Sequence, residues 1–474
     1  MTVAPAAQAA SDLAVPPTTT LDREADHRLV RLVYAFLACA TAWLVCGTAV
    51  GEYIALKFVW PDLGIASWLS EPRLRPIHTN IVLYGWASLG GISLALLVVP
   101  RTSRTSLRHP RFAWTALGLI NTAIIVGTIC LIAGLNNGAQ EYREYLWPVM
   151  ATLVAGIALL LFALYRTVAM RGTEPIYISN WYILGAFIWV ATLLTIAYLP
   201  WYQHGLSETV IQGYFMHNAV GMWFTPLVLG MLYYALPKLL NKPIYSYALG
   251  VLAFWTQLCF YTMLGAHHFV FSPTPWSLQT VAIVFSIGMI VPVFAGTANF
   301  LLTIRGEWSS VADSYALPFI FVGVIMYFVA SMQGTLEAFR SLNTVWHFTD
   351  FTVAHSHMAM YGFVSFLLWG GMYGLMPPLT GRRPSLRLVG VHFWFALIGL
   401  TIYATSLMVG GTLRGISWIH GAPFIDSVVL MVPYWTGRMI GGTLMFLSHL
   451  IFAYNVWRMR PMRAAGEEHV RGAV

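Results

Sequence analysis

Long runs of apolar residues, separated by short polar loops, occupy most of this 474-residue chain. A run of about 20 apolar residues is long enough to cross the hydrocarbon core of a bilayer as a helix. Backbone polar groups must pair within the protein in lipid, and the runs do not alternate between apolar and polar residues, so helices are expected rather than a barrel. Only 9% of the residues are charged, whereas a soluble domain carries roughly 25%. The sequence therefore predicts an all-α integral membrane protein.

We expect twelve transmembrane helices in one domain that extends from residue 29 to residue 460. The expected spans are residues 32–58, 78–99, 113–133, 146–165, 181–199, 213–236, 247–271, 278–303, 315–333, 349–376, 387–409 and 430–457. Residues 1–28 are rich in Ala, Pro and Thr and contain no long apolar run, so they are expected to form a disordered cytoplasmic tail. Residues 461–474 are expected to form a C-terminal cytoplasmic tail.

The basic residues indicate how the chain is oriented in the membrane. With twelve spans, 19 of the 26 Lys and Arg residues fall on the side that holds both termini. Cytoplasmic loops carry an excess of Lys and Arg, so both termini are predicted to face the cytoplasm. These loops account for the net charge of +8, and the expected surroundings are a lipid bilayer with no nucleic-acid partner.

The four cysteines, Cys39, Cys46, Cys130 and Cys259, all lie in apolar spans. None belongs to a C-x-x-C or C-x-x-C-H motif, so the sequence encodes neither a zinc ribbon nor an attachment site for a c-type haem. We expect them to be plain buried cysteines.

Six histidines lie within the apolar segments, and they are His78, His217, His267, His268, His355 and His357. An ionisable ring in a membrane helix is costly, so it marks a functional site by default. The expected topology places all six in the outer part of the membrane. A lone membrane histidine is often a hydrogen-bonded packing residue. Because an H-H pair and an H-x-H pair converge at one depth here, the pattern favours a buried metal and haem centre instead.

The spacing of these histidines suggests how they divide between sites. His355 and His357 are two residues apart on a helix, so their side chains point about 200° apart and can ligate two different haems. His267 and His268 differ by about 100° and can reach one metal beside the helix. His217 on a neighbouring helix would complete a three-histidine copper site, since neutral imidazoles suit copper.

Tyr261 precedes His267 by six residues, which is roughly 9 Å of helix rise. An aromatic packing residue is the ordinary explanation for a tyrosine in such a chain. The functional alternative is a phenol that supplies a proton and an electron to oxygen at the metal site.

The chain resembles the catalytic subunit, subunit I, of cbb3-type (C-family) haem-copper cytochrome c oxidases. The strings that carry the resemblance are R-L-R-P-I-H-T-N around His78, H-N-A-V-G from His217, L-Y-Y-A-L-P-K from Leu232, Y-S-Y at Tyr245, Y-T-M-L-G-A-H-H from Tyr261, F-T-D-F-T-V-A-H-S-H from Phe348, R-M-I-G-G from Arg438 and A-Y-N-V-W-R from Ala453. They occur in family order between about residue 73 and residue 458, and together they are highly specific. The resemblance implies the twelve-helix fold of that subunit.

The resemblance also implies roles for the ligand residues. His78 and His357 would be the axial ligands of a low-spin haem b, and His355 would be the proximal ligand of a high-spin haem b. The copper ion, CuB, would be held by His217, His267 and His268, and Tyr261 would be a redox-active tyrosine joined covalently to His217. Two arginines, Arg75 and Arg438, would bind haem propionates, although interfacial snorkelling is the simpler explanation for both.

Further implications of the resemblance concern protons, electrons and location. Proton uptake from the cytoplasm would use Tyr233, Ser246, Tyr247 and Tyr327, each of which is otherwise an ordinary interfacial or packing residue. Electrons would come from cytochrome c through membrane-anchored c-type cytochrome subunits. They would reach two b-type haems and one copper ion, where O2 is reduced to water. The complex would lie in a bacterial inner membrane and build up a membrane potential. A structural Ca²⁺ ion is neither indicated nor excluded by the sequence.

The sequence departs from the family pattern at three places. Gln333 stands where the family usually carries a glutamate, and Glu337, one helical turn further on, is a possible substitute. Gly250 replaces a serine that is frequent on the family's proton path. The string A-H-S-H-M-A-M-Y-G after Val353 is closer to nitric-oxide reductases.

Two alternatives remain open on the sequence alone. A nitric-oxide reductase of the same superfamily would hold non-haem iron in place of copper. Such enzymes carry a glutamate four residues after the first metal histidine, where this chain has Gly221, and they lack the tyrosine. A transporter or an electron-transferring b-haem subunit is the second alternative. Transporters often show internal repeats, and none is apparent here.

Overall fold

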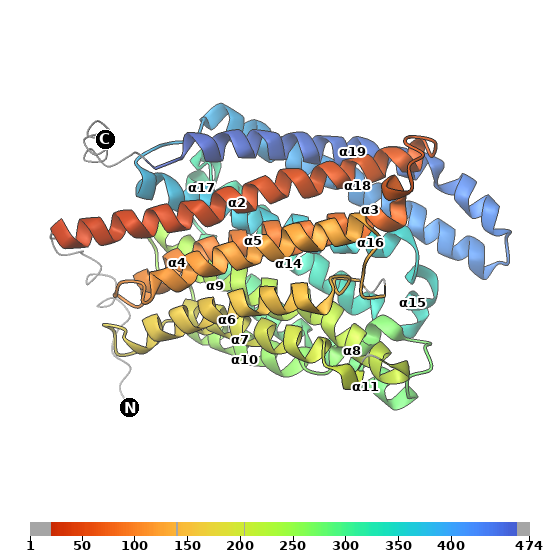
Figure 1. The fold of residues 1–474 in the computed structure, drawn as a ribbon, viewed down its shortest axis with the longest axis horizontal. Helices are drawn as coiled ribbons and strands as arrows, with labels where there is room; N and C mark the ends of the chain where they lie inside the picture. Colours follow the sequence, from red (N-terminus) through yellow and green to blue (C-terminus); the bar gives the residue numbers. More distant parts are fainter. Residues whose placement is uncertain (1–19, 139–140, 203, 462–474) are drawn as a thin grey trace.

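The computed structural model describes residues 20–138, 141–202 and 204–461, and in these residues all regular structure is helical (Figure 1). Residues 1–19 and 462–474 of the two expected tails lie outside the described residues. Helix α2 begins at Thr20, so the prediction of a disordered tail is wrong for residues 20–28.

The helices follow one another in a simple order. They are α2 (Thr20–Val59), α3 (Glu71–Asn80), α4 (Leu89–Thr102), α5 (Pro110–Ile132), α6 (Trp147–Ala169), α7 (Ile178–Ala197), α8 (Gly205–Asn218), α9 (Thr225–Leu240), α10 (Tyr247–Tyr261), α11 (Trp276–Gly288), α12 (Ile290–Ile304), α13 (Trp308–Asp313), α14 (Leu317–Glu337), α15 (Arg340–Trp346), α16 (Asp350–His357), α17 (Phe366–Thr380), α18 (Leu386–Ile419) and α19 (Phe424–Arg458). Short 3-10 helices are η1 (Ser67–Leu69), η3 (Pro200–Tyr202) and η5 (Leu264–Phe269). Three π-helical segments, η2 (Ile81–Ser88), η4 (Ala219–Phe224) and η6 (Met358–Ser365), each join two α-helices into one continuous rod.

Eleven of the helical rods in the described residues are long and apolar enough to cross a membrane. The prediction of an all-helical membrane protein is thus confirmed, but the count of twelve is not. The difference lies in the expected span 247–271, where α10 has only 15 residues. The chain leaves the α-helix at Tyr261 and continues into the 3-10 turn η5.

Three rods form the interior of the bundle. They are Glu71–Thr102, Gly205–Leu240 and Asp350–Thr380, and in their apolar windows 94%, 89% and 89% of residues are buried, against 39–50% in the other eight. Each of these three rods carries one or two of the six histidines. The surrounding helices are buried on one side only, which leaves their other side for lipid.

A π-helical segment follows the histidines directly in each interior rod. At the end of each segment a hydroxyl donates to the carbonyl five residues earlier: Ser88 to Leu83 (2.8 Å), Thr225 to Val220 (3.2 Å) and Ser365 to Met360 (2.9 Å). Such hydroxyls satisfy backbone groups that the wider turn leaves unpaired. Because π-helical turns are rare and concentrate at functional sites, their recurrence beside the histidines points to one shared centre.

Two indole hydrogen bonds tie the interior rods to one another. Trp86 Nε1 donates to Ser365 Oγ (2.8 Å), and Trp223 Nε1 donates to Ser88 Oγ (2.9 Å). Each bond uses the serine that closes a π-helical segment on another rod. The centre of the bundle is therefore fixed by polar contacts as well as by apolar packing.

The start of α2 and the end of α19 lie at the same end of the bundle, where the two helices pack side by side (Figure 1). This arrangement fits an even number of membrane crossings. Two of the cysteines, Cys46 and Cys259, are exposed on the surface of the bundle, so the expectation that all four are buried is wrong.

Candidate metal centre

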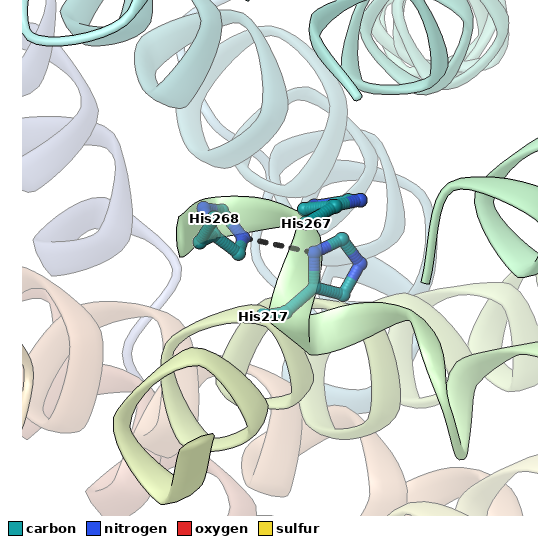
Figure 2. A group of neighbouring side chains, drawn as sticks. All are labelled: His217, His267 and His268. Carbon is teal, nitrogen blue, oxygen red and sulfur yellow. Dashed lines mark hydrogen bonds between the residues drawn. The ribbon is translucent and has the colours of Figure 1, made fainter. Parts of the chain in front are cut away.

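Three imidazoles converge at the junction of α8 and η5 (Figure 2). His217 comes from the last turn of α8, and His267 and His268 come from η5. One ring nitrogen of each lies within 4.8 Å of those of the other two, and His217 Nδ1 is 3.0 Å from His268 Nε2. Three neutral nitrogen donors at this spacing can coordinate one copper, zinc or iron ion at about 2 Å from each.

Close backbone contact holds η5 against α8. A Cβ atom at Gly265 would lie 2.6 Å from Tyr214 Cα and 2.8 Å from the Gly213 carbonyl oxygen, so only glycine fits there. His267 Nδ1 lies 2.6 Å from Ser286 Oγ on α11, which leaves its Nε2 free for a metal. An outer hydrogen bond of this kind fixes the orientation of a ligating imidazole.

Tyr261 lies at the end of α10, beside the histidine cluster. The chain then reaches His267 through the 3-10 turn η5 and not along a continuous α-helix. The Tyr261 ring packs beside His217, with 5.2 Å between the ring centroids. Its ring also fills the space directly over Gly221, where any Cβ atom would overlap it.

His78 and His357 face each other across a second gap. Their ring centroids are 6.3 Å apart and the ring planes differ by 12°. Each Nδ1 lies 2.8 Å from a backbone carbonyl oxygen, that of Gly47 for His78 and that of Val353 for His357, so Nε2 is the remaining ligand atom of each ring. The Tyr403 hydroxyl lies 3.4 Å from His357 Nε2. Two metal–nitrogen bonds of about 2 Å, each with the ring centre about 1 Å beyond, account for the separation of the two rings. The pair therefore fits the two axial positions of one haem iron.

His355 projects from the other face of α16, toward α14. Its Nδ1 is 3.4 Å from Gln333 Oε1 and 3.6 Å from Glu337 Oε1. His355 also interacts electrostatically with His217, His267 and His268. The structure thus brings His217, His267 and His268 into one group with His355 near it, and it places His78 opposite His357 in a second group.

The two arginines have partners in the described residues. Arg438 Nη1 is 3.9 Å from Asp350 Oδ1, and its guanidinium lies over the Phe58 ring at 4.5 Å. Arg75 is more exposed, and its Nη1 is 3.8 Å from Glu141 Oε1. Both lie at the end of the bundle that carries the histidines.

The expected proton-path residues are brought together only in part. Asn299, which the sequence did not single out, donates to the Ser246 carbonyl oxygen (2.8 Å) and to the Tyr233 hydroxyl (3.4 Å). Tyr327 is buried and interacts electrostatically with both Tyr233 and Tyr261. Tyr247 lies apart, because it is exposed and its hydroxyl is directed to the Ile176 carbonyl oxygen at 3.4 Å.

A buried carboxyl group lies in the loop between α5 and α6. Glu144 is 1% exposed, and Asn80 Nδ2 donates to its Oε2 at 2.8 Å. Burial raises the pKa of the Glu144 carboxyl to about 7, an effect that the Asn80 hydrogen bond opposes.

We expect this carboxyl to make the protein less stable as the pH rises. It binds its proton more tightly in the folded protein than in the unfolded chain. Its stabilising contribution is therefore complete below its ordinary pKa of 4.5 and is lost as the pH rises to about 7. Glu144→Gln should flatten the pH dependence of Tm in this range, as measured by thermal unfolding in detergent. Glu174→Gln, an exposed acid in another loop, is the control, and equal slopes for Glu144→Gln and the unmodified protein would contradict the prediction.

Comparisons with known proteins agree with this geometry. A family model described as cytochrome c and quinol oxidase polypeptide I matches residues 31–444. The chain is 30% identical over 448 residues to the Cbb3-type cytochrome c oxidase subunit CcoN1 of Stutzerimonas stutzeri, covering 90% of this chain and 94% of that protein. It is 32% identical over 452 residues to a cytochrome c oxidase subunit 1 homolog of Agrobacterium tumefaciens, covering 91% and 83%.

The fold itself is also known. A solved structure of a heme-copper terminal oxidase dimer superimposes with a TM-score of 0.76 at 16% identity, covering 92% of this chain and 85% of that chain. The family match covers most of the sequence, including all six histidines and Tyr261. The chain therefore belongs to the cytochrome c oxidase subunit I family of haem-copper oxidases, and it is a membrane oxidoreductase.

Proposed function

We propose that this chain is the catalytic subunit of a cbb3-type terminal oxidase that reduces O2 to water. The observation that carries the proposal is the packing of the Tyr261 ring against His217 within the three-histidine cluster. Two b-type haems and one copper ion would supply the electron-transfer and oxygen-reducing chemistry when bound. The reaction also needs a proton source beside the metals, and a phenol in this place meets that need.

In this proposal each ligand residue has one role. His217, His267 and His268 hold copper, His78 and His357 hold the low-spin haem, and His355 holds the high-spin haem. The support is that an outer hydrogen bond occupies Nδ1 of His78, His357 and His267, which leaves Nε2 as the ligand atom of each ring. His357 Nε2 has only a long contact, 3.4 Å, with the Tyr403 hydroxyl. Arg75 and Arg438 are proposed to bind haem propionates, in exchange for part of their present pairing with Glu141 and Asp350.

We propose a proton path that runs from Ser246 through Asn299, Tyr233 and Tyr327 to Tyr261. Ser246 lies at the start of α10, at the opposite end of that helix from Tyr261. A Cβ atom at Gly250 would lie 2.7 Å from Ile178 Cδ1 and 3.1 Å from the Tyr233 hydroxyl, so these two side chains occupy the space that the family serine would need. Tyr247 is not part of the proposed path, because it is exposed on the outside of the bundle.

The short helix α10 and the turn η5 are proposed to act together as the twelfth span, which would place both termini in the cytoplasm. The low number of basic residues at the histidine end of the bundle supports this orientation. Electrons would then arrive from outside, from cytochrome c and membrane-anchored c-type cytochrome subunits. The chain needs such partners because it contains no C-x-x-C-H motif.

The packing around Gly221 favours an oxidase over a nitric-oxide reductase. The reductase pattern needs a glutamate at this position, but any side chain there would occupy the space of the Tyr261 ring. A glutamate at position 221 and the present position of the Tyr261 ring are therefore incompatible in this structure. The chain has the oxidase combination.

This packing leads to a direct prediction. Gly221→Ala should displace the Tyr261 ring and lower oxygen consumption by about 100-fold, the loss expected from an ångström-scale misplacement of a reacting group. Copper and haem contents should stay unchanged. Gly390→Ala is the matched control, since a Cβ atom there meets nothing within 4 Å. Full activity of the Gly221→Ala complex would mean that the position of the tyrosine is unimportant.

The proposed function is tested by turnover of the purified complex with two substrates. We expect rapid consumption of O2 with reduced cytochrome c as the donor, and at most slow consumption of nitric oxide. Turnover of nitric oxide without consumption of O2 would refute the oxidase assignment and favour the reductase.

A further inference from the structure

The last turn of α14 surrounds the Nδ1 side of His355 with two side-chain oxygens. Gln333 Oε1 is 3.4 Å and Glu337 Oε1 is 3.6 Å from His355 Nδ1. Between them Gly334 leaves room for the imidazole, since a Cβ atom there would lie 3.3 Å from His355 Cε1. Two acceptors thus converge on one N–H donor.

Among the described residues, no hydrogen bond of the Glu337 side chain explains why a glutamate stands at this position. Its side chain is 16% exposed, and its Oε1 atom is buried and makes no hydrogen bond there. It is the last residue of α14, where the helix dipole disfavours a negative charge. A buried, unpaired carboxyl oxygen lowers stability. Packing and helix formation therefore both oppose a glutamate at this position.

Gln333 is already engaged on its other side. Its Nε2 lies 3.5 Å from the sulfur of Met408, a contact that turns Oε1 toward His355. The amide is thereby held in place as a neutral acceptor, and Glu337 is left as the group whose oxygen still lacks a donor. His355 Nδ1 lies 3.6 Å from that oxygen.

We infer that Glu337 is the positioning residue of the proximal ligand, and that its carboxyl group accepts the Nδ1–H of His355 when His355 Nε2 binds haem iron. Gln333 supports the same N–H from the preceding turn. This inference rests on the proposed assignment of His355 as an iron ligand. An acceptor on the outer nitrogen fixes the orientation of a ligating imidazole and increases its donor strength. Hydrogen bonds to an axial ligand are one way in which a protein tunes a haem.

The test is the iron–histidine stretching band in the resonance Raman spectrum of the reduced, purified complex. Glu337→Leu should move the band to lower frequency and raise the reduction potential of the high-spin haem. Glu337→Gln, which keeps a neutral acceptor, should move the band in the same direction by a smaller amount. Gln333→Leu is the matched variant on the same helix, and it should shift the band less than Glu337→Leu.

Two outcomes would overturn the inference. One is an unchanged band in both Glu337 variants, and the other is a shift confined to Gln333→Leu, which would make Gln333 the sole partner. If the Glu337→Leu complex contains no haem, the band of Glu337→Gln alone decides. A shift to lower frequency supports the inference, and an unchanged band overturns it. Failure of the proposed function gives a different result, which His355→Gly with added imidazole reveals. If His355 is not the iron ligand, this variant shows the same iron–histidine band as the unmodified protein.

Discussion

Replacing His217 with alanine is expected to remove copper from the complex and to lower oxygen consumption by at least about 100-fold. Loss of an outer hydrogen bond to a metal ligand already costs about 10- to 100-fold in metal affinity or activity, and loss of a ligand should cost more. His217 comes from α8, whereas its two companions come from η5, so its loss removes the one imidazole that α8 contributes to the cluster. The haem spectrum should be retained, because His217 faces the copper ligands rather than the His78–His357 gap.

The experiment compares copper content, haem content and oxygen uptake of the purified complexes. His420→Ala is the matched control, since His420 is exposed at the end of α18 and its Nδ1 contacts only the Ile416 carbonyl oxygen among the hydrogen bonds of the described residues. A His217→Ala complex with normal copper would show that His217 is a packing residue.

Tyr261→Phe is expected to lower oxygen reduction by roughly 100- to 10,000-fold, the usual contribution of a positioned proton donor. Phenylalanine keeps the ring that packs beside His217 and over Gly221. Copper and both haems should therefore remain at normal levels. The variant separates the chemistry of the hydroxyl group from its support of the fold.

Steady-state oxygen uptake and metal content again provide the measurements, with Tyr247→Phe as the control on the exposed side of the same helix. Tyr247 lies outside the proposed path, so its variant should keep nearly full activity. Equal rates for Tyr261→Phe and the unmodified complex would exclude the tyrosine as a proton or electron donor.

The ligand roles of the histidines stay predictions, but helix periodicity was enough to expect His355 and His357 to point to different sides of one helix. His355 and His357 do project toward different neighbours, and His78 does face His357. Hydropathy was sufficient for eleven spans, since lipid imposes a length that is visible in the sequence.

The parts that sequence reasoning missed depend on contacts between distant segments. Nothing local marks Tyr261 as the end of α10, because the next residues are as apolar as those before. The end of the helix becomes understandable only with the close contact between Gly265 and Gly213. The same holds for the three π-helical segments, whose serine and threonine hydrogen bonds involve atoms that an ordinary helix would already have paired.

Two further residues illustrate this limit. Asn299 was overlooked because one amide in an apolar helix is an unremarkable feature, and its importance comes from Ser246 and Tyr233 at its side. The role of Arg438 beside a haem propionate stays a prediction, and its contact with Asp350 on α16 depends on a segment nearly 90 residues away in the sequence. The transporter alternative is no longer supported, since the chain belongs to an oxidoreductase family.

The most direct test of the central claim is metal analysis of the purified complex together with X-ray absorption at the copper edge. The proposal predicts one copper ion per two b-type haems, coordinated by three imidazole nitrogens at about 2 Å. Non-haem iron in place of copper, or copper without histidine coordination, would contradict the assignment of His217, His267 and His268 as the copper site of an oxygen-reducing enzyme.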